Sequence, residues 1–67
     1  MVSIKLKSLK RGDLFVLKDI MYPNHEQVWI KDEYDHSTKK FLVVNYADLS
    51  HSKQLTGDKL VYTDFIF

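Results

Sequence analysis

The chain of 67 residues contains no cysteine, one proline, one tryptophan and two glycines. Without cysteine, neither a disulfide nor a thiolate metal site can stabilise so short a chain. No apolar run approaches the roughly 20 residues that cross a bilayer, and the N-terminal residues lack the apolar stretch of a signal peptide. These absences predict a single domain over residues 1–67, located in the cytoplasm and without a membrane partner.

An excess of charge of one sign is also lacking, because ten Lys and Arg stand against nine Asp and Glu. A dedicated nucleic-acid binder is normally strongly basic. The basic residues are nevertheless unevenly placed, since five of them and a single acid, Asp13, fall between Lys5 and Lys18. Lysines that guard a strand edge explain this bias most simply, and a local basic face for a partner is the alternative.

Both glycines are followed by aspartate, and both pairs precede a strand-like run. Gly12 and Asp13 come before residues 14–17, and Gly57 and Asp58 come before residues 60–63. We therefore expect two structural turns in which glycine adopts a positive φ. The turn also accounts for the tripeptide from Arg11 to Asp13, so an adhesion function is not inferred from it.

Short runs of strand-forming residues recur along the chain, and no segment sustains the 3.6-residue period of a helix. Their spacing favours an all-β fold, a small five-stranded and partly open SH3-like barrel. One short 3-10 or helical turn is expected near residues 46–50. The polar interval 33–40 is expected to be a hairpin turn built by Asp35, Ser37 and Thr38. The five predicted strands are residues 4–7, 14–17, 28–31, 41–45 and 60–63.

The predicted core follows from the same alternation. The inward face of residues 14–17 is left open, because a slip of one residue exchanges the two faces. Residues 20–22 are apolar for a loop and are expected to cap the core, or alternatively to meet a partner. The apolar tail 65–67 is expected to pair in the sheet. The predicted core residues are Leu6, Leu14 or Phe15, Val28 or Trp29, Ile30, Val43, Leu55 and Val61.

Catalytic and metal-binding patterns are weak. His25, His36 and His51 fall in separate predicted loops, without the short spacing that places two ligands on one element. Ser37 follows His36 and Asp35 directly, whereas catalytic triads draw their members from separate elements. The chain also has no glycine-rich phosphate loop, and it is short for enclosing a pocket. We predict no catalytic residues, no metal, no cofactor and no enzymatic activity.

Aromatic and basic residues alternate along the predicted hairpin, a pattern typical of single-strand nucleic-acid platforms. If Val28 and Ile30 face inward, their neighbours in the strand face outward together. The competing interpretation, which we favour, places the only tryptophan in the core of so small a protein. The candidate binding residues are Trp29, Lys31, Tyr34, Lys39 and Lys40.

Three further motifs suggest a relationship. They are Leu9-x-x-Gly12-Asp13-x-Phe15, Glu33-Tyr34-Asp35 with Lys39-Lys40-Phe41, and Gly57-Asp58-Lys59-x-Val61-Tyr62. In these residues the chain resembles a group of short, uncharacterised bacterial and bacteriophage proteins. The resemblance covers nearly the whole chain and implies a one-domain SH3-like β-barrel. It also implies a phage or mobile-element setting, in which small adaptor proteins bind host or nucleic-acid targets.

Two function classes follow from the sequence. The first is a non-catalytic, adaptor-like protein-interaction module whose partner is a protein or peptide. The alternative is a nucleic-acid-binding module that uses the hairpin face around Trp29. The sequence leaves the oligomeric state open.

Overall fold

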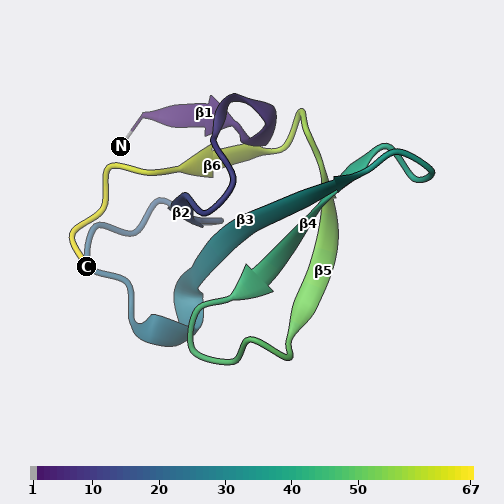
Figure 1. Ribbon diagram of the computed structural model, residues 1–67. Coiled ribbons are helices and arrows are strands. Elements are labelled where there is room, and N and C mark those ends of the chain that lie inside the picture. The colour runs from purple at the N-terminus through teal and green to yellow at the C-terminus, as the bar shows by residue number, and fades with distance from the viewer. Residues whose placement is uncertain (1) are drawn as a thin grey trace.

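The sheet of the computed structural model, which describes residues 2–67, has six antiparallel strands and curls into an open half-barrel (Figure 1). The strand order is β1-β6-β2-β3-β4-β5. The predicted all-β, partly open barrel is confirmed. The strands are β1 (Ser3–Lys5), β2 (Leu14–Val16), β3 (Val28–Asp35), β4 (Lys40–Asn45), β5 (Ser52–Thr56) and β6 (Leu60–Tyr62).

The sixth strand is β5, which the sequence did not predict. Four of its five residues are exposed and polar, and only Leu55 is half-buried. Strand β5 forms because β4 offers it a partner, with Phe41 opposite Leu55 and Val43 opposite Lys53. Its pairing therefore comes from tertiary context and not from its own hydrophobic pattern.

The expected 3-10 turn near residues 46–50 was misplaced. Two 3-10 turns occur in residues 2–67, at η1 (Leu6–Ser8) and η2 (His25–Gln27). Residues 46–50 instead form bends and a single turn, which the His51 N–H closes by donating to the Asp48 carbonyl at 2.9 Å. The Asp48 side chain fixes this turn, since its Oδ1 accepts from the Ser50 N–H at 3.1 Å and the Ser50 Oγ at 2.6 Å.

The β3–β4 hairpin turns at the polar residues that the sequence singled out. Asp35 Oδ1 accepts hydrogen bonds from the Ser37 N–H at 2.9 Å and from the Ser37 Oγ at 2.7 Å. The Lys39 N–H donates to the Asp35 carbonyl at 2.8 Å, and Lys39 adopts a φ of 58°. The turn is thus closed by short-range hydrogen bonds of Asp35, as expected for residues of this kind.

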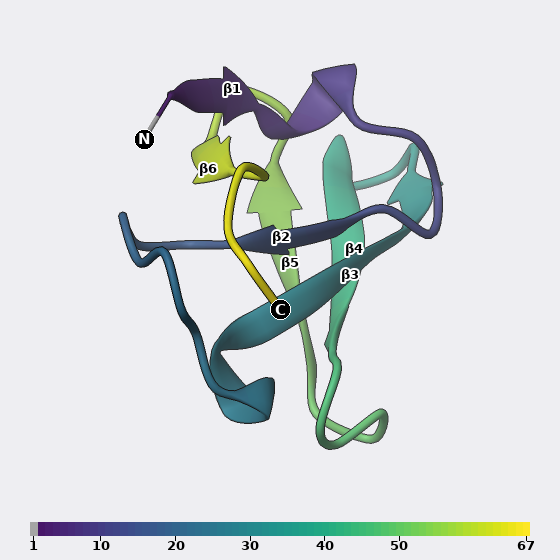
Figure 2. The same cartoon turned by 90° about the vertical axis from the view of Figure 1, so that its left-hand side faces the viewer.

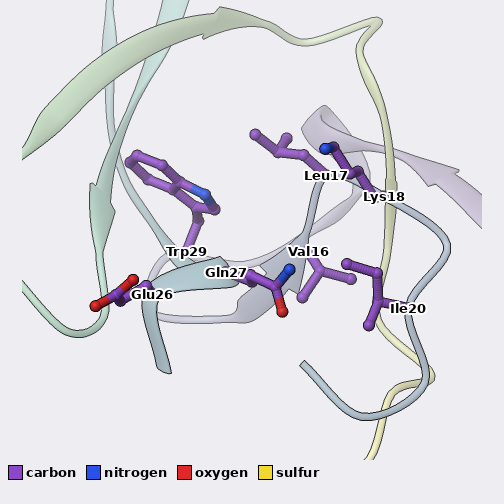
Figure 3. Close-up of a pocket in the computed structure, with 7 residues that line it drawn as sticks. All are labelled: Val16, Leu17, Lys18, Ile20, Glu26, Gln27 and Trp29. Carbon is purple, nitrogen blue, oxygen red and sulfur yellow. The ribbon is translucent and has the colours of Figure 1, made fainter. Parts of the chain in front are cut away.

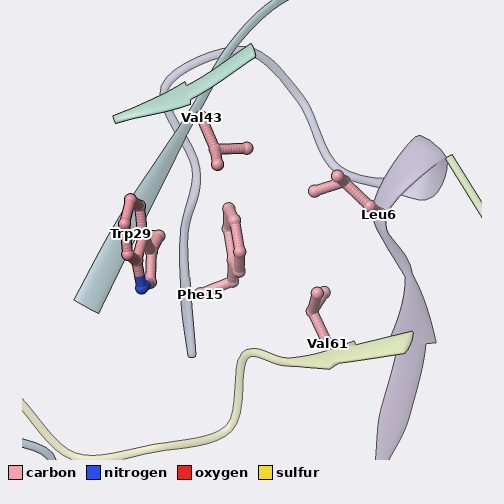
Figure 4. Close-up of a cluster of buried hydrophobic side chains, with 5 residues drawn as sticks. All are labelled: Leu6, Phe15, Trp29, Val43 and Val61. Carbon is pink, nitrogen blue, oxygen red and sulfur yellow. The ribbon is translucent and has the colours of Figure 1, made fainter. Parts of the chain in front are cut away.

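The inner face of the half-barrel carries the main core, in which side chains from five elements converge (Figure 4). Phe15, and not Leu14, faces inward, while Val28 and Trp29 are both buried. Two predicted core residues, Ile30 and Leu55, are only half-buried. Leu55 lies on the edge strand and packs against the outside of the cluster. The cluster consists of Leu6, Phe15, Trp29, Val43 and Val61.

A second buried layer lies on the outer face of β2 and β3. Val16 and Val28 are opposite each other in register and both are fully buried. The chain after β6 runs across the outside of β2 toward the start of β3 (Figure 2), and the Ile66 N–H donates to the Met21 carbonyl at 2.7 Å. The expectation that the tail 65–67 pairs in the sheet is wrong, because β6 already lies between β1 and β2.

The two glycines serve different purposes. Gly12 has a φ of +93°, as predicted for its turn. Gly57 does not adopt a positive φ, which corrects the second prediction. A Cβ placed on Gly57 would lie 3.0 Å from the Cβ of Lys7 and 3.0 Å from the Cε2 of Phe41. Gly57 is therefore required by the close approach of η1 and β4 and not by its backbone angle.

Candidate binding site

The five candidate binding residues do not form one exposed face. Trp29 is only 7% exposed and Lys31 only 5%, and both lie on the inner face of β3. Lys39 is exposed at the hairpin tip, and Lys40 is exposed opposite Asp35. The alternation rule correctly placed Trp29 and Lys31 on the same face, but that face is the interior. The favoured interpretation of Trp29 as a core residue is confirmed.

Trp29 is covered by two side chains at the mouth of the half-barrel. The Nζ of Lys53 lies 4.4 Å from the centroid of the indole ring. His51 packs on the same indole edge-to-face, with ring centroids 5.3 Å apart. Both residues belong to the chain segment that enters or forms β5. The indole is therefore covered on the side of Lys53 and His51 and does not form an exposed platform for stacking.

Lys31 is a buried lysine, and within residues 2–67 no carboxylate lies at salt-bridge distance from its ammonium group. Its Nζ donates to the Leu9 carbonyl and lies 4.2 Å from the centre of the Phe41 ring. Its backbone also holds the turn before β2, because Gly12 N–H donates to the Lys31 carbonyl at 2.8 Å and Lys31 N–H to the Asp13 carbonyl at 3.0 Å. Lys31 thus pins the first glycine turn against β3.

Burial lowers the pKa of Lys31 from its ordinary value of 10.5, and the charge of Asp13 partly opposes this shift. Because the pKa of Lys31 is lower in the folded protein than in the unfolded chain, the unfolded chain binds the Lys31 proton more tightly. Stability contributed by this residue should therefore increase with pH as the folded-state pKa is passed, and level off above 10.5. The difference in urea stability between wild type and Lys31→Met should show this alkaline dependence. A difference that stays constant with pH would contradict it.

Tyr34 and Phe41 border a shallow hollow near the hairpin, together with Lys39 and Gly57. The Tyr34 ring packs against Phe41 with centroids 4.8 Å apart and against His36 at 4.9 Å. These contacts hold the aromatic rings together on the hairpin side of the β3 bulge, which lies between Lys31 and Tyr34. The hairpin thus carries an aromatic cluster with lysines around it, and not an open stacking platform.

The residues considered above for catalysis or adhesion all make contacts with neighbouring side chains. Ser37 donates to Asp35 as described, while His36 packs on Tyr34. Arg11 forms ion pairs with Asp32 and Glu33, each at 3.2 Å. Within residues 2–67, no three His, Asp or Glu side chains gather as metal ligands would. None of the helical turns in the described chain is long and apolar enough to span a bilayer.

A slot opens beside Trp29 at the end of β2, with a volume of about 190 Å³ (Figure 3). Trp29 lies on one side of it, and Leu17 points toward it from the other. Lys18 and Glu26 contribute charges of opposite sign. A cavity of roughly 150 Å³ already holds a benzene-sized group, so the slot has room for one bulky apolar side chain. The lining residues are Val16, Leu17, Lys18, Ile20, Glu26, Gln27 and Trp29.

Next to this slot, the segment 18–27 exposes apolar side chains. Ile20 is half-buried and lines the slot, whereas Met21 is 48% and Tyr22 72% exposed. For residues 20–22 the sequence left two alternatives, capping of the core or contact with a partner. Ile20 fits the first alternative, whereas Met21 and Tyr22 are exposed. Ile66 and Phe67 of the tail are exposed as well. Apolar surface from two segments therefore gathers on one side of the half-barrel.

An aromatic cluster ties these segments to the turn after β4. His25 packs edge-to-face on Tyr46, with centroids 5.6 Å apart, and on Phe67 at 5.0 Å. Tyr46 and Phe67 are themselves in contact at 4.9 Å. The apolar loop residues 20–22 and the apolar tail 65–67 gave the sequence signals for this surface. The slot itself depends on how residues 18–27 fold back on β2, which no sequence pattern indicated.

Comparison with known proteins does not extend this description. The chain matches no protein-family model, no curated protein and no solved structure.

Proposed function

We propose that the protein is a non-catalytic protein-interaction module that binds a partner peptide through the slot beside Trp29. The observation that supports it is the double role of the segment 18–27. Its residue Ile20 lines an apolar slot, and its next residues, Met21 and Tyr22, expose apolar surface. An exposed apolar patch next to a slot of side-chain size is typical of a protein-binding surface.

The chemistry of the slot defines the partner. Leu17, Ile20 and Trp29 offer apolar contacts to a single bulky side chain, which would be the anchor of the peptide. Lys18 and Glu26 lie at the same slot with opposite charges. They favour a ligand with charged groups of both signs beside the anchor, because complementary charges set orientation and specificity.

A peptide library displayed on phage tests this proposal. Selection against the wild-type protein should enrich peptides with one bulky aliphatic or aromatic residue. Ile20→Lys places a charge at the slot and should weaken binding of the selected peptides at least about tenfold, the loss expected from an apolar anchor meeting a buried charge. Thr38→Lys adds the same charge at the hairpin tip and should leave binding unchanged.

Two results would count against a peptide-binding slot. One is the absence of any enriched motif, and the other is equal binding of the selected peptides by the Ile20→Lys protein. Thermal melts of both variants ensure that a loss of binding does not come from unfolding.

Nucleic-acid binding remains the competing prediction, and the same proteins test it. Binding of single-stranded DNA to the lysines of the hairpin should weaken steeply with rising salt, because bound counterions are released. Peptide binding in an apolar slot should respond far less. Strong, salt-sensitive DNA binding that Lys39→Glu removes would favour the alternative over the peptide module.

A further inference from the structure

Strand β5 is the last strand of the sheet, and its outer edge is open. It lies outermost beside β4 in the ribbon (Figure 1), and among residues 2–67 no strand pairs with its other side. Ser52, Lys53, Gln54 and Thr56 are all exposed. The end of the strand and the turn that follows are covered, because the Lys59 N–H donates to the Thr56 carbonyl at 3.1 Å and the Lys7 N–H to the Gly57 carbonyl at 3.0 Å.

The register shows which peptide groups of β5 are free. The Asn45 N–H donates to the His51 carbonyl at 2.8 Å, and the ladder continues from this pair into β4 and β5. Hydrogen-bonded pairs alternate along an antiparallel ladder. The peptide groups of Lys53 and Leu55 are therefore directed toward β4, and those of Ser52, Gln54 and Thr56 point away from the sheet. The Thr56 carbonyl accepts from the Lys59 N–H at 3.1 Å, which leaves the groups of Ser52 and Gln54 and the Thr56 N–H free.

The usual protections of a strand edge are missing from β5. Its ladder with β4 runs without a bulge, and its sequence contains no proline. Its one charged residue is Lys53, whose Nζ lies over the Trp29 ring on the inner face. A lysine held there does not stand in the path of a strand that approaches the edge.

We propose that two copies of the protein associate through this edge, with β5 pairing antiparallel to the β5 of the partner about Gln54. In this register Gln54 faces the partner's Gln54, and Ser52 faces the partner's Thr56. Lys53 faces the partner's Leu55, so that no like charges are opposite each other. The Gln54 pair, and the bond from the Thr56 N–H to the carbonyl of the partner's Ser52, use free peptide groups of β5. The two half-barrels then share one continuous sheet.

Neighbouring registers fit less well. A pairing centred on Lys53 places two lysines directly opposite each other, which is unfavourable. A pairing centred on Leu55 gives up the Gln54–Gln54 pair, and within β5 its hydrogen-bonded pairs join Gln54 to Thr56, whose carbonyl already accepts from the Lys59 N–H. The charge pattern and the free peptide groups therefore both select the register centred on Gln54.

Sedimentation equilibrium over a range of protein concentrations tests the association. The wild type should form a dimer as concentration rises. Gln54→Pro removes an outward N–H without touching the bonds to β4, and Gln54→Lys places two positive charges opposite each other. Each should weaken the dimer at least about tenfold, whereas Thr38→Lys should leave the dissociation constant unchanged.

Disulfide cross-linking tests the register, since the chain has no cysteine of its own. In hydrogen-bonded pairs the Cα atoms are about 5.5 Å apart, within the range of a disulfide. Gln54→Cys should therefore cross-link two copies on mild oxidation, and Ser52→Cys should not. A wild type that stays monomeric at every concentration would overturn the proposal. So would a dimer that both Gln54 variants retain, or one that Ser52→Cys cross-links as readily as Gln54→Cys.

Discussion

Gly57→Val should remove a large part of the stability of the protein. The added side chain meets the Cβ of Lys7 and the ring of Phe41, each 3.0 Å from the position of the new Cβ. Overpacking of this kind typically costs about 1–3 kcal/mol. Cores of domains below about 70–80 residues rarely supply more than roughly 3–5 kcal/mol. The free energy of unfolding, measured with urea, should fall accordingly.

Gly12 provides the matched control for this experiment. A Cβ on Gly12 meets no atom within 4 Å, but its φ of +93° strains any residue that carries one. Gly12→Asn should therefore be tolerated better than Gly12→Val, because asparagine accepts positive φ more readily. At Gly57 the two substitutions should both destabilise, since the obstacle there is space. Equal tolerance of asparagine at both positions would contradict this distinction.

Trp29→Ala should leave the protein mostly unfolded at room temperature. The indole is 7% exposed and belongs to the central cluster with Phe15 and Val43. Truncating a buried tryptophan costs about 3–5 kcal/mol, which is as much as a domain of this size can lose. Circular dichroism and urea unfolding should show the loss, and Trp29→Phe should retain more of the structure.

The emission of Trp29 in the wild type checks the same placement. A buried indole should emit at short wavelength and resist quenching by acrylamide. Emission at the wavelength of water-exposed tryptophan, or a Trp29→Ala protein as stable as the wild type, would remove Trp29 from the core. The binding tests proposed above use Ile20 instead of Trp29 because they require a folded variant.

The fold was predictable where hydrophobic pattern determines it. The runs around Phe15, Trp29 and Val43 have strand composition, and each became a strand of the half-barrel. Strand β5 was not predictable, because its residues are polar and its pairing comes from β4. Similarly, the sequence indicates that Gly57 belongs to a turn. It does not show why glycine is needed there, because a positive φ and a close approach of neighbouring atoms both select glycine.

The candidate site was less predictable than the fold. Alternation placed Trp29 and Lys31 together, yet it could not say which face of β3 is the interior. Lysine ordinarily marks the exposed face, and Lys31 departs from this rule because Leu9 and Phe41 provide partners for its ammonium group. The slot depends on the path of the loop around Ile20, which follows from tertiary packing alone.

The pairing of β1 with β6 has a consequence for how the protein assembles during synthesis. Ile4 lies opposite Val61, so the first strand of the sheet finds its partner only in the last. Closing a loop of this length must precede the contacts that stabilise it, which slows folding. Emerging from the ribosome, the β3–β4 hairpin can form early, whereas residues 3–5 remain unpaired until β6 has been made. The nascent chain thus carries an unpaired strand from the synthesis of residues 3–5 until residues 60–62 have followed.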